Sequence, residues 1–236
     1  MRYSFFMTVT TLLAVAVSWG GVSVVKPRVA GSRGLKSISI RDESGAQVEL
    51  YKGSYALVIG VSDYTAGWQS LPSVKAEVED IIGFLTANGF TVRGVHNPDD
   101  EMLKQEFEQF IDQYGYDPDN RLLIFFSGHG YSRRKGSKGY LVPADAPDPR
   151  TDERGFLRKA LPMSQIQAWA RQMEAKHVLF LFDSCFSGTV FKTKALPKVP
   201  RHISSLTARP VRQFIAAGDA GEEVPAKSVF SPCFVR

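Results

Sequence analysis

The sequence predicts an α/β fold in which helices cover both faces of a mostly parallel sheet. Three continuous apolar runs, each bounded by polar or glycine residues, are typical of buried strands; they lie at 55–61, 122–126 and 178–182. Between these runs, apolar residues recur at helical spacing. Strands that alternate with helices favour parallel pairing through crossover connections. The 236 residues are enough for one sizeable domain.

The segments between and after the three runs predict the remaining helices and strands. The first run leads to a helix that begins after Pro72 and ends at Asn88-Gly89, a strand at 90–95, and a helix from Asn97 to Asp117. The second run leads to a long polar loop at 131–160, with one short strand at 139–142, and then to a helix at 163–175 capped by Ser164. A last strand is predicted at 211–217.

The N-terminus predicts export. Met1-Arg2 is positively charged, residues 5–17 are apolar except for three threonines, and small residues follow up to Ser23. This pattern is typical of a signal peptide, here residues 1–23, for a periplasmic or secreted protein. The run is short for a membrane span of about 20 residues, although an uncleaved anchor is the alternative. Residues 24–50 are predicted to be a linker with a short strand at 37–40, and 51–236 to be one domain.

The positive charge is concentrated in one segment. The net charge is +5, from 29 basic and 24 acidic residues. Residues 185–217 contain six lysines and arginines and no acidic residue. Without interleaved aromatic residues, this segment does not resemble a nucleic-acid-binding surface, so we expect no nucleic-acid partner.

Small, polar or ionisable residues follow four of the predicted strands: Ser62-Asp63, Ser127-Gly128-His129, Asp183-Ser184-Cys185 and Gly218-Asp219. In an open parallel sheet, ligands bind just beyond the carboxyl ends of the strands. The four clusters therefore predict a site at one end of the sheet.

Cys185 is the candidate nucleophile of this site. A cysteine among small residues, where a strand ends and a helix is expected to begin, suits a reactive thiolate. The alternatives are a buried inert cysteine and a disulfide with Cys233, the second of the two cysteines. A metal site is disfavoured because the chain has no CxxC or HExxH pattern, so we expect no metal and no cofactor.

Among the four histidines, His129 is the best partner for a thiolate. His177 begins the strand that leads to Cys185, so it lies at the wrong end, and His202 lies in the basic segment. His96 follows a strand that we expect to be peripheral. The backbone N–H groups of Gly130 and Cys185 could hold an oxyanion.

The two motifs, S-G-H-G at 127–130 and D-S-C-F-S-G at 183–188, resemble those of the caspase and metacaspase-like cysteine peptidases. The resemblance runs from Tyr55 to the end of the chain. It implies a caspase-haemoglobinase fold and a protein or peptide substrate that Cys185 attacks while His129 transfers the proton to the leaving amine. The family continues beyond the S-V-F at 228–230 with a closing helix, so we expect the domain to be truncated there, as a fragment or naturally.

The resemblance and the acidic residues also predict specificity. The family position that matches Asp183 binds a basic substrate residue, and Asp219 and Glu222 are further candidates for the same pocket. Negative charge there would favour Arg or Lys before the scissile bond. Alternatively, Asp183 caps a helix and the acidic residues near 219–223 lie in a solvated loop.

Two further expectations follow from the resemblance. Related enzymes are often cut between the Cys-bearing half and the next strand, which makes four residues possible self-cleavage sites: Lys192, Lys194, Lys198 and Arg201. A solvated basic loop without processing is the alternative. The alternatives to an endopeptidase are a non-catalytic binding or signalling module of this fold and a different thiol hydrolase or redox sensor. Calcium activation and the oligomeric state are left open by the sequence.

Overall fold

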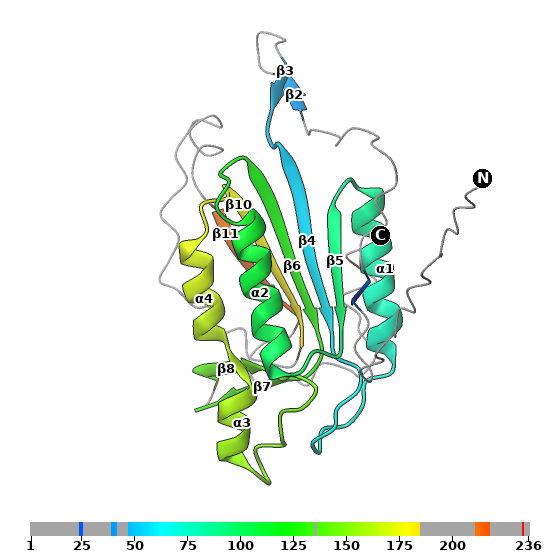
Figure 1. Ribbon diagram of the computed structural model, residues 1–236, viewed down its shortest axis with the longest axis vertical. Helices are drawn as coiled ribbons and strands as arrows, with labels where there is room; N and C mark the ends of the chain where they lie inside the picture. Colours follow the sequence, from blue (N-terminus) through cyan, green and yellow to red (C-terminus); the bar gives the residue numbers. More distant parts are fainter. Residues whose placement is uncertain are drawn as a thin grey trace, which may run out of the picture.

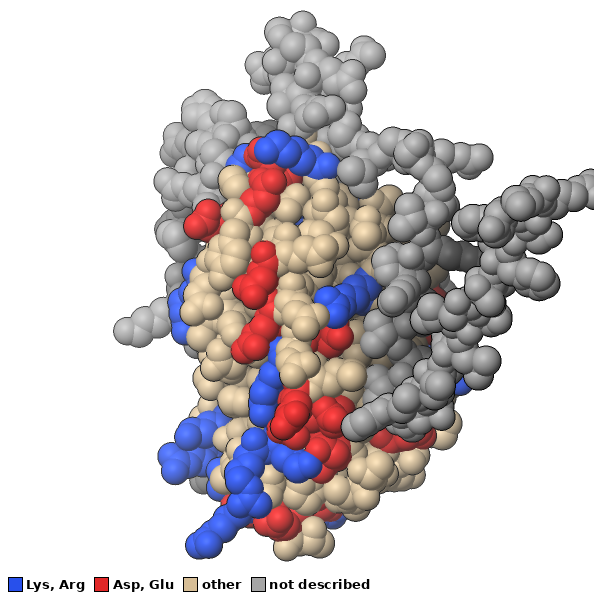
Figure 2. All heavy atoms as spheres, in the orientation of Figure 1, with Lys and Arg blue, Asp and Glu red and all other residues tan. Residues whose placement is uncertain are grey.

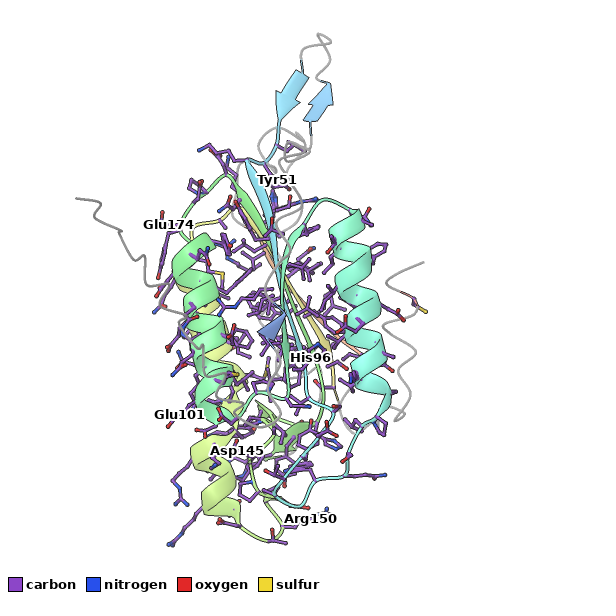
Figure 3. All side chains as sticks on the ribbon, turned by 45° about the vertical axis from the view of Figure 1, so that its right-hand side comes forward. Tyr51, His96, Glu101, Asp145, Arg150 and Glu174 are labelled. Carbon is purple, nitrogen blue, oxygen red and sulfur yellow. The ribbon has the colours of Figure 1, made fainter. Side chains whose placement is uncertain are left out.

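The structure is a computed structural model that describes residues 24–25, 39–41, 47–134, 136–184, 211–217 and 233. A central sheet lies between two helical layers (Figures 1 and 3). Helix α1 (Ser73–Ala87) covers one face, and helices α2 (Asp100–Tyr114) and α4 (Met163–Gln172) cover the other. The predicted three-layer α/β arrangement is confirmed.

The sheet has six strands in the order β1-β5-β4-β6-β10-β11. Their bounds are β1 Val24–Val25, β4 Gly53–Gly60, β5 Thr91–His96, β6 Asn120–Ser127, β10 His177–Asp183 and β11 Val211–Ala216. Every pairing among β5, β4, β6, β10 and β11 is parallel, and β1 alone is antiparallel, to β5. Because the five parallel strands run the same way, their carboxyl ends lie together at what we call the carboxyl end of the sheet.

The continuous apolar runs follow from burial on both faces. Successive side chains of a strand point to opposite faces, so each central strand supplies both core clusters. Leu57, Ile124 and Phe180 pack against α2 and α4, whereas the neighbouring Val58, Phe125 and Leu181 pack against α1. All six are at most 1% exposed. A strand covered on both sides has no position for a polar side chain, which explains the sequence pattern.

The segment at 131–160 has the predicted short strand, but the rest of it is folded rather than a loop, so that part of the prediction was wrong. It contains a hairpin of β7 (Gly130–Arg133) and β8 (Lys138–Leu141), followed by α3 (Glu153–Lys159). The Asp152 carboxylate accepts a hydrogen bond from Gly155 N at 2.8 Å and so caps α3. The helix has only seven residues, and Phe156, packed beside Tyr140, is its one fully buried large side chain. The sequence of α3 therefore shows no clear helical periodicity.

Helix α4 begins without the predicted serine cap. Strand β9 (Leu161–Pro162) pairs with β8 and runs directly into α4, where Pro162 occupies the N-cap position and no side chain caps the helix. Ser164 lies inside the first turn and is exposed. The backbone strand that precedes the helix, rather than a serine side chain, therefore sets where α4 starts.

The part of the chain before β4 contains a second small pairing. Strands β2 (Ser39–Arg41) and β3 (Gln47–Glu49) are antiparallel, where the sequence predicted one strand at 37–40. Among the described residues, no helix has the length and hydropathy of a membrane span. The proposed signal peptide, residues 1–23, lies outside the described residues and stays a prediction.

Charges of both signs are interspersed on the face of the molecule that carries α2 and α3 (Figure 2). Lys159 of α3 forms ion pairs with Asp145 and Asp100, which joins α3 to the start of α2. Lys104 also pairs with Asp100, at 3.1 Å. Lys104 and Lys159 are thus both balanced by carboxylates near the start of α2.

Candidate functional site

Three central strands end side by side at the carboxyl end of the sheet. Ser127 of β6 pairs in register with Gly60 of β4 on one side and with Asp183 of β10 on the other. The hydrogen bonding continues beyond the strands, since Val61 N donates to Ser127 O at 2.9 Å and Gly128 N donates to Asp183 O at 3.3 Å. The carboxyl ends of β4, β6 and β10 are therefore held next to one another, as parallel pairing predicts.

His129 is held by two polar contacts. Its backbone N–H donates to the Tyr64 hydroxyl at 2.7 Å, and its ring Nε2 lies 2.8 Å from the carbonyl oxygen of Gln69. A carbonyl can only accept, so Nε2 carries the proton of the neutral ring. The remaining nitrogen, Nδ1, is then the basic atom that can exchange a proton at this site.

Two aromatic rings enclose the imidazole of His129. The Trp68 ring lies at 5.0 Å between centroids and the Tyr64 ring at 4.8 Å. The resulting burial lowers the pKa of His129, and the hydrogen bond to Gln69 O raises it by a smaller amount. His129 is therefore a neutral base near pH 7, available to take up a proton.

The two glycines of the S-G-H-G motif lie in different environments. A Cβ on Gly128 would lie 2.9 Å from the Tyr64 hydroxyl oxygen and 3.2 Å from Val61 Cβ, so a side chain there would displace the contacts that hold His129. Gly130 faces Leu141 across the hairpin, and Val142 N donates to His129 O at 3.1 Å. This pattern defines a non-hydrogen-bonded pair, in which the Gly130 N–H points away from β8.

The Asp183 carboxylate lies at the same end of the sheet. It is 5% exposed, beside Ser127 on the face that α1 covers, because side chains of register partners share a face. Ser184 is 2% exposed, and its hydroxyl has no hydrogen-bond partner within the described part of the chain. Cys185 itself, the predicted nucleophile, lies outside the described residues, as do Asp219, Glu222 and the four basic residues of the predicted self-cleavage segment.

The other histidines are placed away from this constellation. His177 begins β10 and bonds through Nδ1 to the Tyr51 hydroxyl at 2.9 Å, which puts it at the opposite end of the sheet, as predicted. Figure 3 shows Tyr51 at that opposite end, with His96 nearer the carboxyl end of the sheet. His96 ends β5 and lies 3.1 Å from a Glu79 carboxylate oxygen. His202 lies outside the described residues.

The sequence did not indicate that the segment after β4, residues 61–72, belongs to the site. Its residues Tyr64, Trp68 and Gln69 make the contacts described above to the backbone N–H and the ring of His129. The segment is anchored at both ends, because Thr65 N donates to Ala144 O at 2.8 Å and Leu71 N donates to Ser62 O at 2.7 Å. Two aromatic residues soon after a buried strand were the only sequence signal of this role.

Asn97 fixes the start of that segment. Its side-chain oxygen accepts hydrogen bonds from Ser62 N at 2.7 Å and from Asp63 N at 3.0 Å. Asn97 has a φ of +48°, a conformation that asparagine adopts more readily than most residues. The turn after β5 thereby holds the turn after β4.

Neither a disulfide nor a metal cluster is formed by the described residues. Cys233 is exposed and free. No group of three or more histidine, cysteine or acidic side chains in the described ranges is arranged to hold a metal ion.

Replacing Trp68 with alanine should raise the pKa of His129 towards the ordinary value of about 6.5, because water would reach the imidazole. An NMR pH titration of the His129 ring measures this. Trp68→Phe keeps a ring against the imidazole and should keep the pKa below 6.5. An unchanged His129 pKa in Trp68→Ala would mean that the tryptophan does not cause the shift.

Comparison with known proteins identifies the family. The caspase domain of the C14 peptidases matches residues 54–227. Comparison with curated proteins gives no match.

Two solved structures resemble the chain at low identity. Protein GSU0716 from Geobacter sulfurreducens shares 15% identity, with a TM-score of 0.41 over 56% of this chain and 50% of that one. The Drosophila initiator caspase Dronc shares 13% identity, with a TM-score of 0.44 over 69% of this chain and 63% of that one. The chain thus spans less than two thirds of either protein. On the family match over residues 54–227, the chain belongs to the caspase-domain peptidase family.

Proposed function

We propose that the chain is a cysteine endopeptidase that uses Cys185 as nucleophile and His129 as proton carrier. The observation that supports this most is the fixed imidazole of His129, whose Nε2 is bound to Gln69 O and whose Nδ1 is left as the basic nitrogen. His129 follows Ser127 by two residues, and Cys185 follows Asp183 by two, where Ser127 and Asp183 are register partners. The thiol would therefore be presented beside the base.

In the proposed reaction, Nδ1 of His129 takes the proton of the Cys185 thiol, and the resulting thiolate attacks the carbonyl carbon of the scissile bond. The backbone N–H groups of Gly130 and Cys185 stabilise the resulting oxyanion. His129 protonates the leaving amine nitrogen, the C–N bond breaks, and an acyl-enzyme thioester remains. His129 then takes a proton from water, which attacks the thioester. The C–S bond breaks, the acid leaves, and His129 returns the proton to the Cys185 sulfur.

We further propose that the pocket prefers Arg or Lys before the scissile bond. Asp183 provides a carboxylate beside the strand that carries His129, and a buried carboxylate binds a guanidinium or ammonium group strongly. Asp219 and Glu222 stay proposed contributors. The basic residues Lys192, Lys194, Lys198 and Arg201 would then suit self-cleavage.

A panel of fluorogenic peptides ending in Arg, Lys, Asp or Leu tests this proposal, with and without calcium. We expect cleavage after Arg and Lys by the native chain and none by Cys185→Ala. Asp183→Asn should reduce the preference for Arg over Leu by at least about tenfold, the usual cost of losing a charged hydrogen-bond partner. Cleavage after Asp alone would contradict the specificity.

An Arg-ended peptide with a thiol-reactive group separates the two cysteines. Mass spectrometry should locate the label on Cys185, and Cys233→Ser should label as the native chain does, although Cys233 is exposed and free. Labelling that needs Cys233, or that persists in Cys185→Ala, would refute the assignment of the nucleophile. A chain that binds peptides without labelling or cleavage would be a non-catalytic module.

A further inference from the structure

A small cavity lies at the end of the sheet opposite His129. It has a volume of about 160 Å³, and it is lined by the starts of β6, β10 and β11 together with Tyr51 and Phe90. Its floor consists of two register rows of neighbouring strands: Arg121, His177 and Val211 in the first, and Leu123, Leu179 and Gln213 in the second. The cavity is therefore separate from the proposed catalytic residues.

Arg121 brings a positive charge into this cavity without an acidic partner. Its side chain is partly buried, and no carboxylate of the described residues lies within ion-pair distance of it. The acidic residues closest to Arg121 along the sequence, Asp117 and Asp119, pair with Lys52 and Lys176 instead. A half-buried guanidinium without a counter-ion is costly, which makes an anion from outside a favourable occupant.

The arginine is also held in place. Its Nε donates to the Ser54 hydroxyl at 2.7 Å, and its guanidinium lies over the Phe90 ring at 4.4 Å and near the Tyr51 ring at 5.6 Å. The Nε bond leaves the terminal N–H groups of the planar fork for a ligand. A fixed fork of this kind matches both oxygens of a carboxylate.

Besides Arg121, Tyr51, His177 and Gln213, the remaining lining of the cavity is apolar. Leu123 and Leu179 form its floor, and Phe90 stands at its side. Apolar cavities of about 150 Å³ accommodate a molecule of the size of benzene. A ligand that fits both the Arg121 fork and the apolar lining carries one carboxylate and an apolar body about as large as benzene.

We propose that this cavity is a binding site for small apolar monocarboxylates, with the carboxylate on Arg121 and the apolar body on Leu123 and Leu179. The His177 imidazole, in the register row of Arg121, lines the cavity as a further polar group. The site is distinct from peptide-bond hydrolysis, and it would exist in a chain without peptidase activity.

Calorimetric titration of the full chain with benzoate tests the proposal. We expect a dissociation constant on the order of 1 mM, which is typical of so small a ligand. Acetate, which lacks the apolar body, and benzyl alcohol, which lacks the charge, should each bind at least about tenfold more weakly. NMR shifts on benzoate addition should centre on the starts of β6 and β10.

Variants separate this site from general anion attraction. Arg121→Gln should weaken benzoate binding at least about tenfold, whereas Arg154→Gln, which removes an exposed arginine of α3, should leave it unchanged. Leu179→Phe fills the cavity and keeps the charge of Arg121, so it should also abolish benzoate binding. If Arg121→Gln does not fold, the Leu179→Phe result tests whether benzoate binds in this cavity. Equal binding of benzoate, acetate and inorganic phosphate, or equal losses in both arginine variants, would overturn the proposal.

Discussion

His129→Gln is expected to lower kcat/KM for an Arg-ended peptide by about 10²–10⁴-fold, the usual contribution of a positioned acid–base group. The glutamine amide can still donate to Gln69 O, as Nε2 of the imidazole does, but it has no basic nitrogen. The fold should therefore survive while proton transfer is lost. Steady-state assays with a fluorogenic peptide measure the effect.

His96→Gln is the matched control. His96 ends the neighbouring β5, and its ring contacts Glu79 rather than the segment that holds His129. This variant should keep most of the activity. Equal losses in the two variants would show that histidines at this end of the sheet act through stability and would refute a specific role for His129.

The lowered pKa of His129 also has a consequence for stability that the same variant tests. Around pH 6.5 the unfolded chain takes up a proton on this histidine that the folded chain does not bind. Stability therefore rises with pH in this range and falls as the pH drops below about 6.5. The His129→Gln chain should lose part of this acid dependence in denaturant melts at pH 5 and pH 7.5.

Phe107→Ala is expected to reduce the free energy of unfolding by about 3–5 kcal/mol. Phe107 of α2 is fully buried and stacks on Trp169 of α4 at 5.5 Å between ring centroids. Removing it leaves a cavity between the two helices that cover this face of the sheet. Because a domain is stable by about 5–15 kcal/mol in all, the loss would be a large fraction of the total.

Urea unfolding followed by circular dichroism measures this change. Tyr116→Ala is the control, because Tyr116 is 46% exposed and its removal should change stability by less than about 0.5 kcal/mol. A Phe107→Ala variant with native stability would show that the joint between α2 and α4 does not support the domain.

Strand burial and strand ends were predictable from sequence. The apolar runs at 55–61, 122–126 and 178–182 have few interpretations, since a strand covered on both faces excludes polar residues. The convergence of Ser62, Ser127 and Asp183 then follows from parallel pairing alone. These features were predictable because the residues concerned are either buried in a central strand or placed directly after one.

Other features depended on tertiary contacts that leave a weak local pattern. Helix α3 has seven residues and one fully buried aromatic side chain, Phe156, so helical periodicity cannot reveal it. The start of α4 is set by the pairing of β9 with β8 rather than by Ser164. The role of Trp68 and Gln69 depends on how the segment after β4 folds back over the end of β6, which spacing along the chain does not record.

The carbonyl of Gln69 links the imidazole to a larger unit of the fold. Besides the two anchors at its ends, the segment that carries Gln69 is bound where Asp148 N donates to Ala66 O at 3.1 Å. Opening these backbone bonds would free Nε2, so that either ring nitrogen could then carry the proton. The tautomer of one histidine is therefore tied to the backbone hydrogen bonds that hold the segment around Gln69 against residues 144–148.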